Sequence, residues 1–500
     1  MTSLWLDRRR TAGTTATVRD SFIPEEDVDA VVIGAGLTGL VTALLLVRSG
    51  MRVTVLEGRT IGGGNTGLTT AKLSILQGTV LSGLRKFYSA HVVAAHVEGN
   101  KEGQAWLLRY LDEHGTPYQV RDAFTYATTD DGVRQLEAEL KAAKEAGLGV
   151  LTTRETGLPF SVRNAILLPR QAQFDPMDVL ETLAADIRGR GGRIVEHCRV
   201  HDVETPGRAK VVTDAGSMNA ETVVLATGHP ILNRGLYFTK LLAHRSYAVA
   251  MNVPDPSTLP QGMYLSAESP VRSVRTTPGD NGEILMVGGN GHPTGRFPSP
   301  KQRVDELIAW GREHFSGAEP MLAWGAQDYK SVSLMPIFGL LPRGAGRIYV
   351  ATGYNKWGMT NAVVAALGIS SQILGGGPAW AKTLHHRVTH PAGVTSFAGL
   401  NLGAARAVAD GRSRVAKAPH DGVPAPAEGT GIITRDGTPT AVSTVDGQTC
   451  KLSAVCTHLG GILTWNDADK SWDCPLHGSR FSPTGEVLDG PANRNLRRLD

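Results

Sequence analysis

The chain has 500 residues, of which 41% are hydrophobic and 20% charged, a composition typical of a globular protein with about three domains. A formal net charge of +4, with no Lys/Arg run longer than Arg8-Arg9-Arg10, argues against nucleic acid as the main partner. Four cysteines are too few for a disulfide framework, so a reducing, cytoplasmic compartment is expected.

Residues 1–28 are predicted to form an N-terminal extension. Paired arginines can announce twin-arginine export, but no apolar stretch follows them in residues 11–22, so we expect no export signal. The longest apolar run lies within residues 31–47, which contain three glycines and are too short for a membrane span. We therefore expect a soluble cytoplasmic protein.

Residues 29–59 follow the strand–turn–helix–strand pattern of a dinucleotide-binding unit. Gly34, Gly36 and Gly39 have G-x-G-x-x-G spacing after a short apolar run. The first glycine permits the turn, the second lets the backbone approach a pyrophosphate, and the third lets the helix pack on the strand. Glu57 ends the second strand, where a carboxylate accepts hydrogen bonds from ribose hydroxyls. By itself this pattern fits either FAD or NAD.

Three later segments favour FAD. Residues 62–74 resemble the flavin-contacting segment of the D-amino-acid-oxidase-like superfamily, and residues 222–230 resemble the strand-plus-ATG signature of FAD-binding folds. Residues 346–362 place a strand before a glycine-rich turn and a helix start, which in that superfamily points its positive end at the flavin pyrimidine. The resemblance implies these cofactor-binding residues: Thr66, Thr69, Thr70, Ala71, Ala226, Thr227, Gly228, Gly353, Trp357, Gly358, Met359 and Thr360.

The middle of the chain alternates helical and strand-like stretches. Residues 132–147 are predicted to form an amphipathic surface helix, and residues 283–292 a strand. The resemblance implies an FAD-binding domain over 29–405, mainly 29–90, 150–235 and 330–405. An antiparallel substrate domain, mainly 91–149 and 236–329, would interrupt it.

Five side chains are candidate catalytic groups. Lys72 follows the flavin segment and could contact the flavin, bind a substrate carboxylate, or pair at a domain seam. A probable substrate-domain strand carries His244, Arg245 and Tyr247, which could shape the pocket or be structural. His292 lies in a glycine-rich loop that could face the flavin, and Tyr354 flanks the final flavin turn.

The last 100 residues are predicted to contain a linker and a small domain. Residues 395–411 are expected to form a helix, and residues 406–428, rich in Pro, Gly and small side chains, a linker. Residues 429–500 are expected to form a β-rich domain that begins with a hairpin over 431–446, turning at Asp436-Gly437.

That domain contains two Cys–His pairs, Cys456-x-His458 and Cys474-x-x-His477. Four such ligands could hold zinc, but zinc fingers usually keep like ligands together. One Cys and one His from each of two loops is the arrangement of a Rieske [2Fe–2S] cluster. CTHLGG and CPLHGS also resemble the Rieske loops outside the ligands.

Four neighbouring residues bear on this resemblance. Gly461 and Leu476 stand where respiratory Rieske proteins carry a bracing disulfide. Ser479 stands where a serine donates to a bridging sulfide, and Phe481 replaces a tyrosine that donates to a ligand thiolate. Fewer such hydrogen bonds predict a potential in the lower half of the Rieske range of about −150 to +300 mV. The other cysteines are expected to be free thiols: Cys198 and Cys450.

Over nearly its whole length the chain resembles bacterial FAD-dependent oxidoreductases with a C-terminal Rieske domain, within the D-amino-acid-oxidase/glycine-oxidase superfamily. The matching segments include SLWLD, NTGLTTAKL, FTKLLAHRSY, WGAQDY, NKWGMTNA, WNDADKSWDCP and GPA. The implied fold is an α/β FAD-binding domain of the glutathione-reductase-like, D-amino-acid-oxidase type, interleaved with an antiparallel-sheet substrate domain and followed by a small all-β Rieske domain. At Ser333 the chain departs from an expected aspartate, which suggests a different substrate.

The resemblance implies a dehydrogenase that oxidises an amine or amino acid to an imine by hydride transfer to FAD. The [2Fe–2S] cluster would relay single electrons to an external carrier. Whether the protein forms a homo-oligomer does not follow from the sequence. Two alternatives remain: the cluster feeds electrons to the flavin for reductive or oxygen-dependent chemistry, or the protein is a redox sensor without small-molecule turnover.

Overall fold

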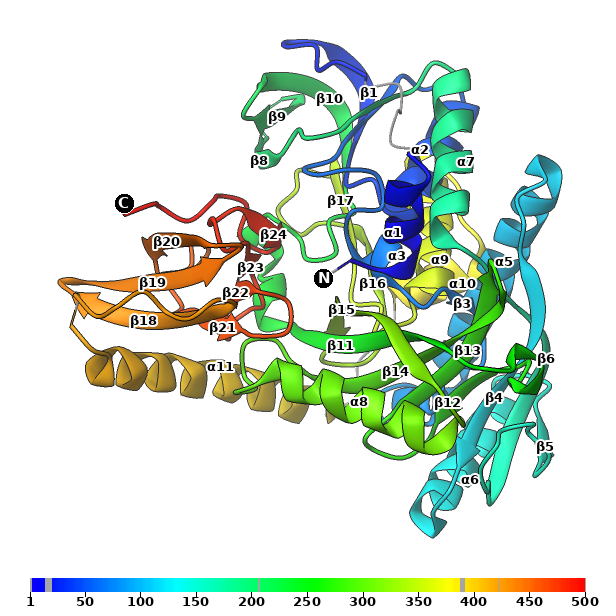
Figure 1. Ribbon diagram of the computed structural model, residues 1–500. Coiled ribbons are helices and arrows are strands. Elements are labelled where there is room, and N and C mark those ends of the chain that lie inside the picture. Colours follow the sequence, from blue (N-terminus) through cyan, green and yellow to red (C-terminus); the bar gives the residue numbers. More distant parts are fainter. Residues whose placement is uncertain (1, 14–19, 206, 387–391, 421, 500) are drawn as a thin grey trace.

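The computed structural model describes residues 2–13, 20–205, 207–386, 392–420 and 422–499, and a largely parallel sheet lies at one end of it (Figure 1). The strand order of this nucleotide sheet is β16–β17–β10–β1–β2–β7, with β8 and β9 attached through β10. Its strands are β1 (Asp27–Ile33), β2 (Val53–Leu56), β7 (Arg193–Val195), β8 (Val200–Glu204), β9 (Ala209–Thr213), β10 (Gly216–Leu225), β16 (Ile337–Leu340) and β17 (Ile348–Thr352). β1 pairs in parallel with both β10 and β2, as the apolar runs predicted.

Helices cover the nucleotide sheet, and α2 (Leu37–Arg48) is their centre. Almost every side chain of α2 is buried, because α7 (Pro176–Gly189) and α9 (Gly358–Ile373) pack against it. The outer layer consists of α5 (Ala90–His114) and α10 (Ala379–His385). At the N-terminus, α1 (Leu4–Thr11) packs on α3 (Asn65–Leu68), where the buried Trp5 donates its indole N–H to the Thr69 carbonyl over 2.7 Å.

A second, mostly antiparallel sheet forms the substrate side. Its order is β15–β11–β14–β13–β12–β4–β6–β3, with β5 on β6. The strands are β3 (Lys72–Leu73), β4 (Gln119–Ala127), β5 (Leu151–Thr153), β6 (Asn164–Gln173), β11 (Leu241–Asn252), β12 (Met263–Ser266), β13 (Arg272–Gly279), β14 (Gly282–Pro293) and β15 (Glu319–Ser331). Its helices are α4 (Val80–Leu84), α6 (Asp130–Glu145) and α8 (Pro300–His314).

Two predicted boundaries differ from the structure. Residues 151–173, expected in the nucleotide part, form β5 and β6 of the substrate sheet because β6 pairs along β4. Residues 406–417, expected as linker, are helical: α11 runs over Ala392–Lys417, and the first proline after Ala392 is Pro419. The glycines and small residues of 406–417 suggested a linker. Because this stretch contains no proline, it can continue the helix.

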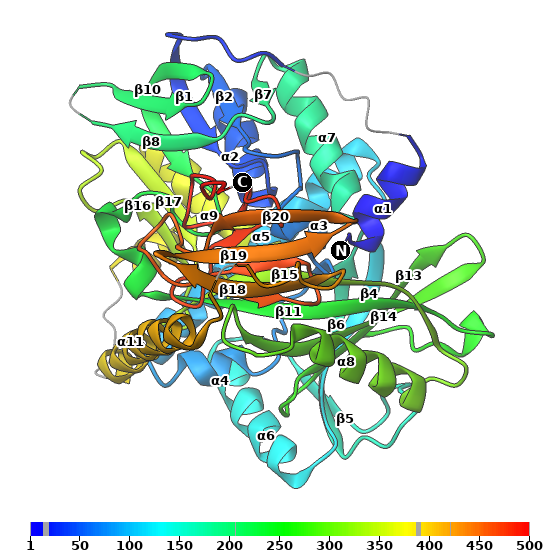
Figure 2. The ribbon, with the colours of Figure 1, turned by 60° about the vertical axis from the view of Figure 1, so that its left-hand side comes forward.

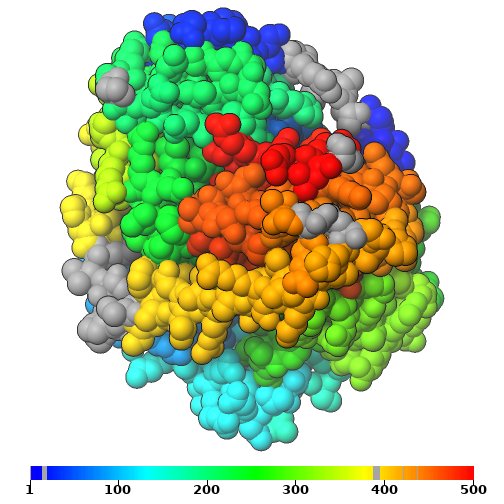
Figure 3. All heavy atoms as spheres, turned by 90° about the vertical axis from the view of Figure 1, so that its left-hand side faces the viewer, coloured from blue at the N-terminus to red at the C-terminus, as the bar shows by residue number. Residues whose placement is uncertain are grey.

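The C-terminal domain consists of two small antiparallel sheets. β18 (Thr430–Asp436), β19 (Thr438–Val445) and β20 (Gln448–Ser453) form the first, and the turn between β18 and β19 lies at Gly437, as predicted. β21 (Thr464–Asn466), β22 (Ser471–Asp473), β23 (Arg480–Phe481) and β24 (Val487–Asp489) form the second. The domain lies over β11 and β15 (Figure 2), and α11 crosses the same face of the molecule (Figure 3).

The pair β11–β15 separates two parts of the molecule. His244 pairs with Asp328 and Arg245 with Gln327, so paired side chains point alternately to opposite faces. The face with His244 borders the cavity described below. The face with Arg245 meets the C-terminal domain, where Gln327 donates to the Gly478 carbonyl over 2.7 Å. None of the helices among the described residues is long and apolar enough to cross a membrane.

Candidate active site and metal centre

A cavity of about 770 Å³ lies between the nucleotide sheet, the substrate sheet and the C-terminal domain. Its nucleotide end is lined by Gly34, Gly36 and Glu57, and its walls elsewhere come from β11, β15 and the loop before α9. The sequence-predicted segments that lie far apart in the chain therefore converge on one space.

Gly34 and Gly36 line a cradle at the start of α2, and Gly34 leaves no room for a side chain. Gly34 has φ +108°, and a Cβ there would lie 2.5 Å from the Ala226 carbonyl oxygen. A Cβ on Gly39 would lie 1.9 Å from the Gly34 carbonyl oxygen, so Gly39 serves close packing and does not line the cavity. The cradle opens at the N-terminus of α2, whose positive end suits a diphosphate, so these residues fit FAD.

Glu57 links the cradle to the next segment. Its carboxylate accepts hydrogen bonds from the Ala35 and Arg59 amides, each over 2.8 Å. Thr66 accepts from the Leu37 amide over 3.1 Å and so ties the flavin segment to the start of α2. Three predicted residues of that segment line the cavity, Thr66, Thr69 and Thr70, whereas Ala71 is buried outside the lining.

The remaining predicted cofactor residues come from the segments that follow β10 and β17. Seven line the cavity: Ala226, Thr227, Gly228, Gly353, Trp357, Gly358 and Met359. Thr360 lies behind them and accepts a hydrogen bond from Gln77 over 2.9 Å. Because α9 begins at Gly358, its positive end is directed to the cavity.

Four of the five catalytic candidates line the cavity: Lys72, His244, Tyr247 and Tyr354. Lys72 donates to the Tyr264 carbonyl over 2.8 Å and to the Ser273 hydroxyl, and burial, with a smaller effect of Arg275, lowers its pKa to about 7. Burial and the charge of Lys356 lower the pKa of His244 to about 2, so its imidazole is neutral. The Tyr354 hydroxyl lies 2.8 Å from that of Thr38.

Tyr247 lines the cavity with part of its side chain, but its hydroxyl meets the fifth candidate, His292, on the other face of the substrate sheet. The Tyr247 hydroxyl lies 3.0 Å from Nε2 of His292, and His292 does not line the cavity. Arg245, the register partner of His292, forms an ion pair with Asp469 of the C-terminal domain. Tyr247 lies two residues after Arg245 on β11, which pairs regularly with β15 here, so both side chains point to the same face of the sheet. The expected contact of His292 with the flavin is therefore not supported.

Three charged groups of the cavity were missed by sequence reasoning: Asp328, Lys330 and Lys356. Both lysine side chains are accessible within the cavity and have no hydrogen-bond or ion-pair partner among the described residues. The protein around Lys356 nevertheless encloses it, and this burial lowers its pKa to about 8. Burial likewise raises the pKa of Asp328 to about 6. Two of them lie in the family-like segments WGAQDY and NKWGMTNA, which contain Asp328 and Lys356, and Lys330 directly follows the first segment.

The two Cys–His pairs meet at the edge of the C-terminal domain. The thiols of Cys456 and Cys474 are hydrogen-bond partners, and the rings of His458 and His477 are 5.1 Å apart. Within the described residues no three Cys, His, Asp or Glu side chains converge on one point. The two cysteines therefore lie together and the two histidines lie together. This arrangement fits the two irons of a Rieske cluster, one bound by cysteines and one by histidines, better than a single zinc ion.

The pKa values of the four ligands are shifted in different directions. The hydrogen bond between the thiols lowers the pKa of Cys456 to about 7 and raises that of Cys474, so one thiolate forms readily. Burial lowers the pKa values of His458 and His477 to about 4, which keeps both imidazoles neutral. A Cβ on Gly461 would lie 2.7 Å from the Leu476 side chain. The two residues that stand at the positions of the respiratory disulfide therefore face each other.

The nucleotide part of the chain contacts both histidines. Phe238 packs edge-on against His458 and His477, with ring centroids 5.6 and 5.1 Å away. Nε2 of His458 lies 3.0 Å from the side-chain oxygen of Asn233. Phe238 and Asn233 belong to short 3-10 turns between β10 and β11, so the metal centre and the cavity share their supporting elements.

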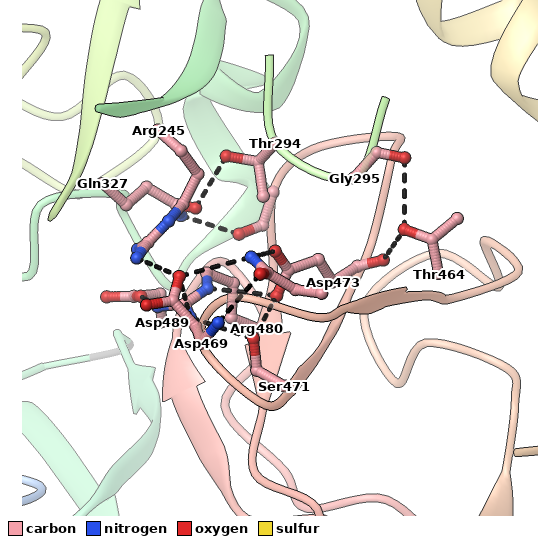
Figure 4. Close-up of polar contacts among 12 residues, drawn as sticks. Arg245, Thr294, Gly295, Gln327, Thr464, Asp469, Ser471, Asp473, Arg480 and Asp489 are labelled. Atoms are coloured by element: carbon pink, nitrogen blue, oxygen red, sulfur yellow. Dashed lines mark hydrogen bonds and ion pairs between the residues drawn. The ribbon is translucent and has the colours of Figure 1, made fainter. Parts of the chain in front are cut away.

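A buried charge cluster fixes the C-terminal domain against the substrate sheet (Figure 4). Arg245 reaches Asp469, which also pairs with Arg480 over 3.2 Å. Arg480 further contacts Asp473 over 3.1 Å and Asp489 over 2.9 Å. All five side chains are at most 15% exposed.

Comparisons with known proteins agree with this architecture. The family model described as FAD dependent oxidoreductase (DAO) matches residues 29–371, and that of the Rieske [2Fe-2S] domain matches residues 418–500. The putative Rieske 2Fe-2S iron-sulfur protein YhfW of Bacillus subtilis (strain 168) is 27% identical over 481 residues, which cover 95% of this chain and 94% of that protein.

Solved structures share the fold of the first two parts. Glycine oxidase from Geobacillus kaustophilus superposes with a TM-score of 0.60 at 18% identity, over 71% of this chain and 96% of that one. L-Proline dehydrogenase from P. horikoshii gives a TM-score of 0.60 at 19% identity, over 72% and 96%. FAD and a Rieske [2Fe–2S] cluster are accordingly the cofactors. The chain belongs to the FAD-dependent oxidoreductase family and carries a C-terminal Rieske domain.

Proposed function

We propose that this oxidoreductase is a dehydrogenase that oxidises the C–N bond of an amine or amino acid to an imine and delivers electrons singly to an external carrier. Bound FAD supplies a hydride acceptor, and the Rieske cluster supplies a one-electron relay. The main support is the contact between the cluster-ligand loop and the wall of the cavity. Gly478, next to the ligand His477, accepts from Gln327, and its Cα approaches Ala243 so closely that a Cβ would lie 2.0 Å from the alanine methyl.

This contact favours a dehydrogenase over a plain oxidase. Oxygen reoxidises the flavin of an oxidase directly, so an oxidase needs no iron–sulfur outlet beside the cavity. The 770 Å³ cavity in turn favours small-molecule turnover over a redox sensor. The proposal includes a cytoplasmic location and an external carrier that accepts one electron at a time.

The charges on the wall favour an amino acid over a simple amine. Lys330 and Lys356 line the cavity without an ion pair among the described residues. The Asp328 carboxylate acts on Lys356 only at longer range, so a substrate carboxylate would still offset the burial of the two cations. Lys72 adds a third cation when protonated. The neutral His244 borders the same wall, but its Nδ1 is buried beside Gly291 and adds no charge to the cavity.

Anaerobic stopped-flow reduction tests the proposal. The holoprotein is mixed with a panel of amines and amino acids while flavin and cluster absorbance are followed separately. We expect flavin bleaching by at least one amino acid, followed by cluster reduction. Bleaching only by a reduced carrier protein would instead support the reverse electron flow, and no response to any small molecule would support the sensor.

A further inference from the structure

The Rieske domain supplies one wall of the nucleotide cavity. The segment 487–493, from β24 onward, borders the same cavity as Gly34 and Glu57 of the nucleotide sheet. The residues concerned are Leu488, Asp489, Gly490, Ala492 and Asn493. They are mostly small, so backbone can come close to a bound molecule.

Hydrogen bonds hold this wall against the nucleotide side. Arg199 donates to the Val487 carbonyl over 3.0 Å. Asn493 donates its side-chain amide to the His201 carbonyl over 2.6 Å, and Nδ1 of His201 lies 2.8 Å from the Asn493 carbonyl oxygen. The wall therefore belongs to the nucleotide site as much as to the Rieske domain.

Two guanidinium groups at this place suit an anion. Arg59 and Arg199 line the cavity beside Glu57 and the wall. Burial raises the pKa of Asp489, but its ion pair with Arg480 over 2.9 Å and the more distant charge of Arg59 more than offset it, so this carboxylate is charged. A diphosphate entering the cradle would meet both arginines and complete their charge balance.

The wall is also connected to the metal centre through Ser479. Its fully buried hydroxyl accepts from the Ala492 amide over 3.0 Å and donates to the Cys456 sulfur. Its carbonyl accepts from the Cys474 amide over 2.7 Å. One side chain thus contacts a cluster ligand and the nucleotide wall.

We propose that residues 487–493 of the Rieske domain are part of the FAD-binding site, closing over the diphosphate end, and that the cluster-ligand loop holds them there through Ser479. FAD affinity then depends on the Rieske domain. The inference goes beyond the proposed C–N oxidation and does not rest on it, since it needs only the two cofactors and no substrate.

Equilibrium binding of FAD to the flavin-stripped full chain, followed by flavin fluorescence, tests it. Ser479→Ala leaves all four cluster ligands in place, and Asn493→Ala removes the bond to His201. We expect either change to raise the Kd for FAD about tenfold, the usual cost of a buried hydrogen bond near a charged ligand. The matched control is Glu486→Gln, exposed and in the same domain, which should leave the Kd unchanged. Unchanged Kd values in both test variants would overturn the proposal.

Hydrogen–deuterium exchange on the unaltered protein gives a second test. It remains decisive even when a variant loses its iron. Adding FAD to flavin-stripped protein should slow amide exchange in 487–493 and leave β20 in the same domain unaffected. Equal exchange in 487–493 with and without FAD would contradict the proposed wall.

Discussion

Replacing Arg245 with methionine tests how the Rieske domain is held on the substrate sheet. The Arg245 side chain is 1% exposed and that of its partner Asp469 is 7% exposed, so the variant leaves a buried carboxylate with fewer partners. Breaking a buried ion pair costs about 3–5 kcal/mol. Asp469 keeps Arg480 at 3.2 Å, so we expect the lower end, about 3 kcal/mol.

The assay is urea unfolding of the holoprotein followed by the visible circular dichroism of the cluster. Lys301→Met is the matched control, because its pair with Asp305 is exposed and should contribute at most about 0.5 kcal/mol. The double variant Arg245→Met/Asp469→Asn should lose less than the sum of the single losses, since the orphaned charge is gone. A loss for Arg245→Met no larger than that of the control would refute the reasoning.

Three further changes test the cofactor sites. Gly34→Ala should abolish stable FAD binding because its Cβ would meet the Ala226 carbonyl at 2.5 Å, and a normal flavin content per chain would disprove this. Because the pKa of Lys72 is about 7, its side chain loses its charge above neutral pH. The KM for an anionic amino acid should therefore rise above neutral pH in the wild type but not in Lys72→Met. The same pH profile in both proteins would count against a role of Lys72 in substrate binding. This lowered pKa also means that the Lys72 contribution to stability increases as the pH rises from about 7 to 10.5. Phe481→Tyr should raise the cluster potential in a redox titration by adding a donor near the ligand thiolates, and an equal or lower potential would argue against that placement.

Local patterns predicted the cofactor-binding parts well. The G-x-G-x-x-G turn, its flanking strands and Glu57 are where the sequence places them, because a glycine turn and a buried strand depend on residues close in the chain. The Cys–His loops were predicted for the same reason, since each loop carries its own ligands and glycines. Cys198 and Cys450 are free thiols, as expected.

Side-chain direction in the substrate sheet could not be predicted in this way. Tyr247 and His292 are predicted from chemistry and position, yet strand pairing directs their polar groups to the Rieske interface. A shift of one residue in register exchanges the two faces of a strand, and local sequence does not set that register. The same cause hid Asp328 and Lys330, which face the cavity from β15.

The sequence by itself determined the two cofactors and the order of the domains, because turns, ligand spacing and short buried strands are local properties. Only the tertiary structure decided that residues of the C-terminal domain line the nucleotide cavity. Contacts such as Arg245 with Asp469 and Asn493 with His201 join residues more than 200 positions apart. They form only once three separately patterned units pack together and bury their charges against one another.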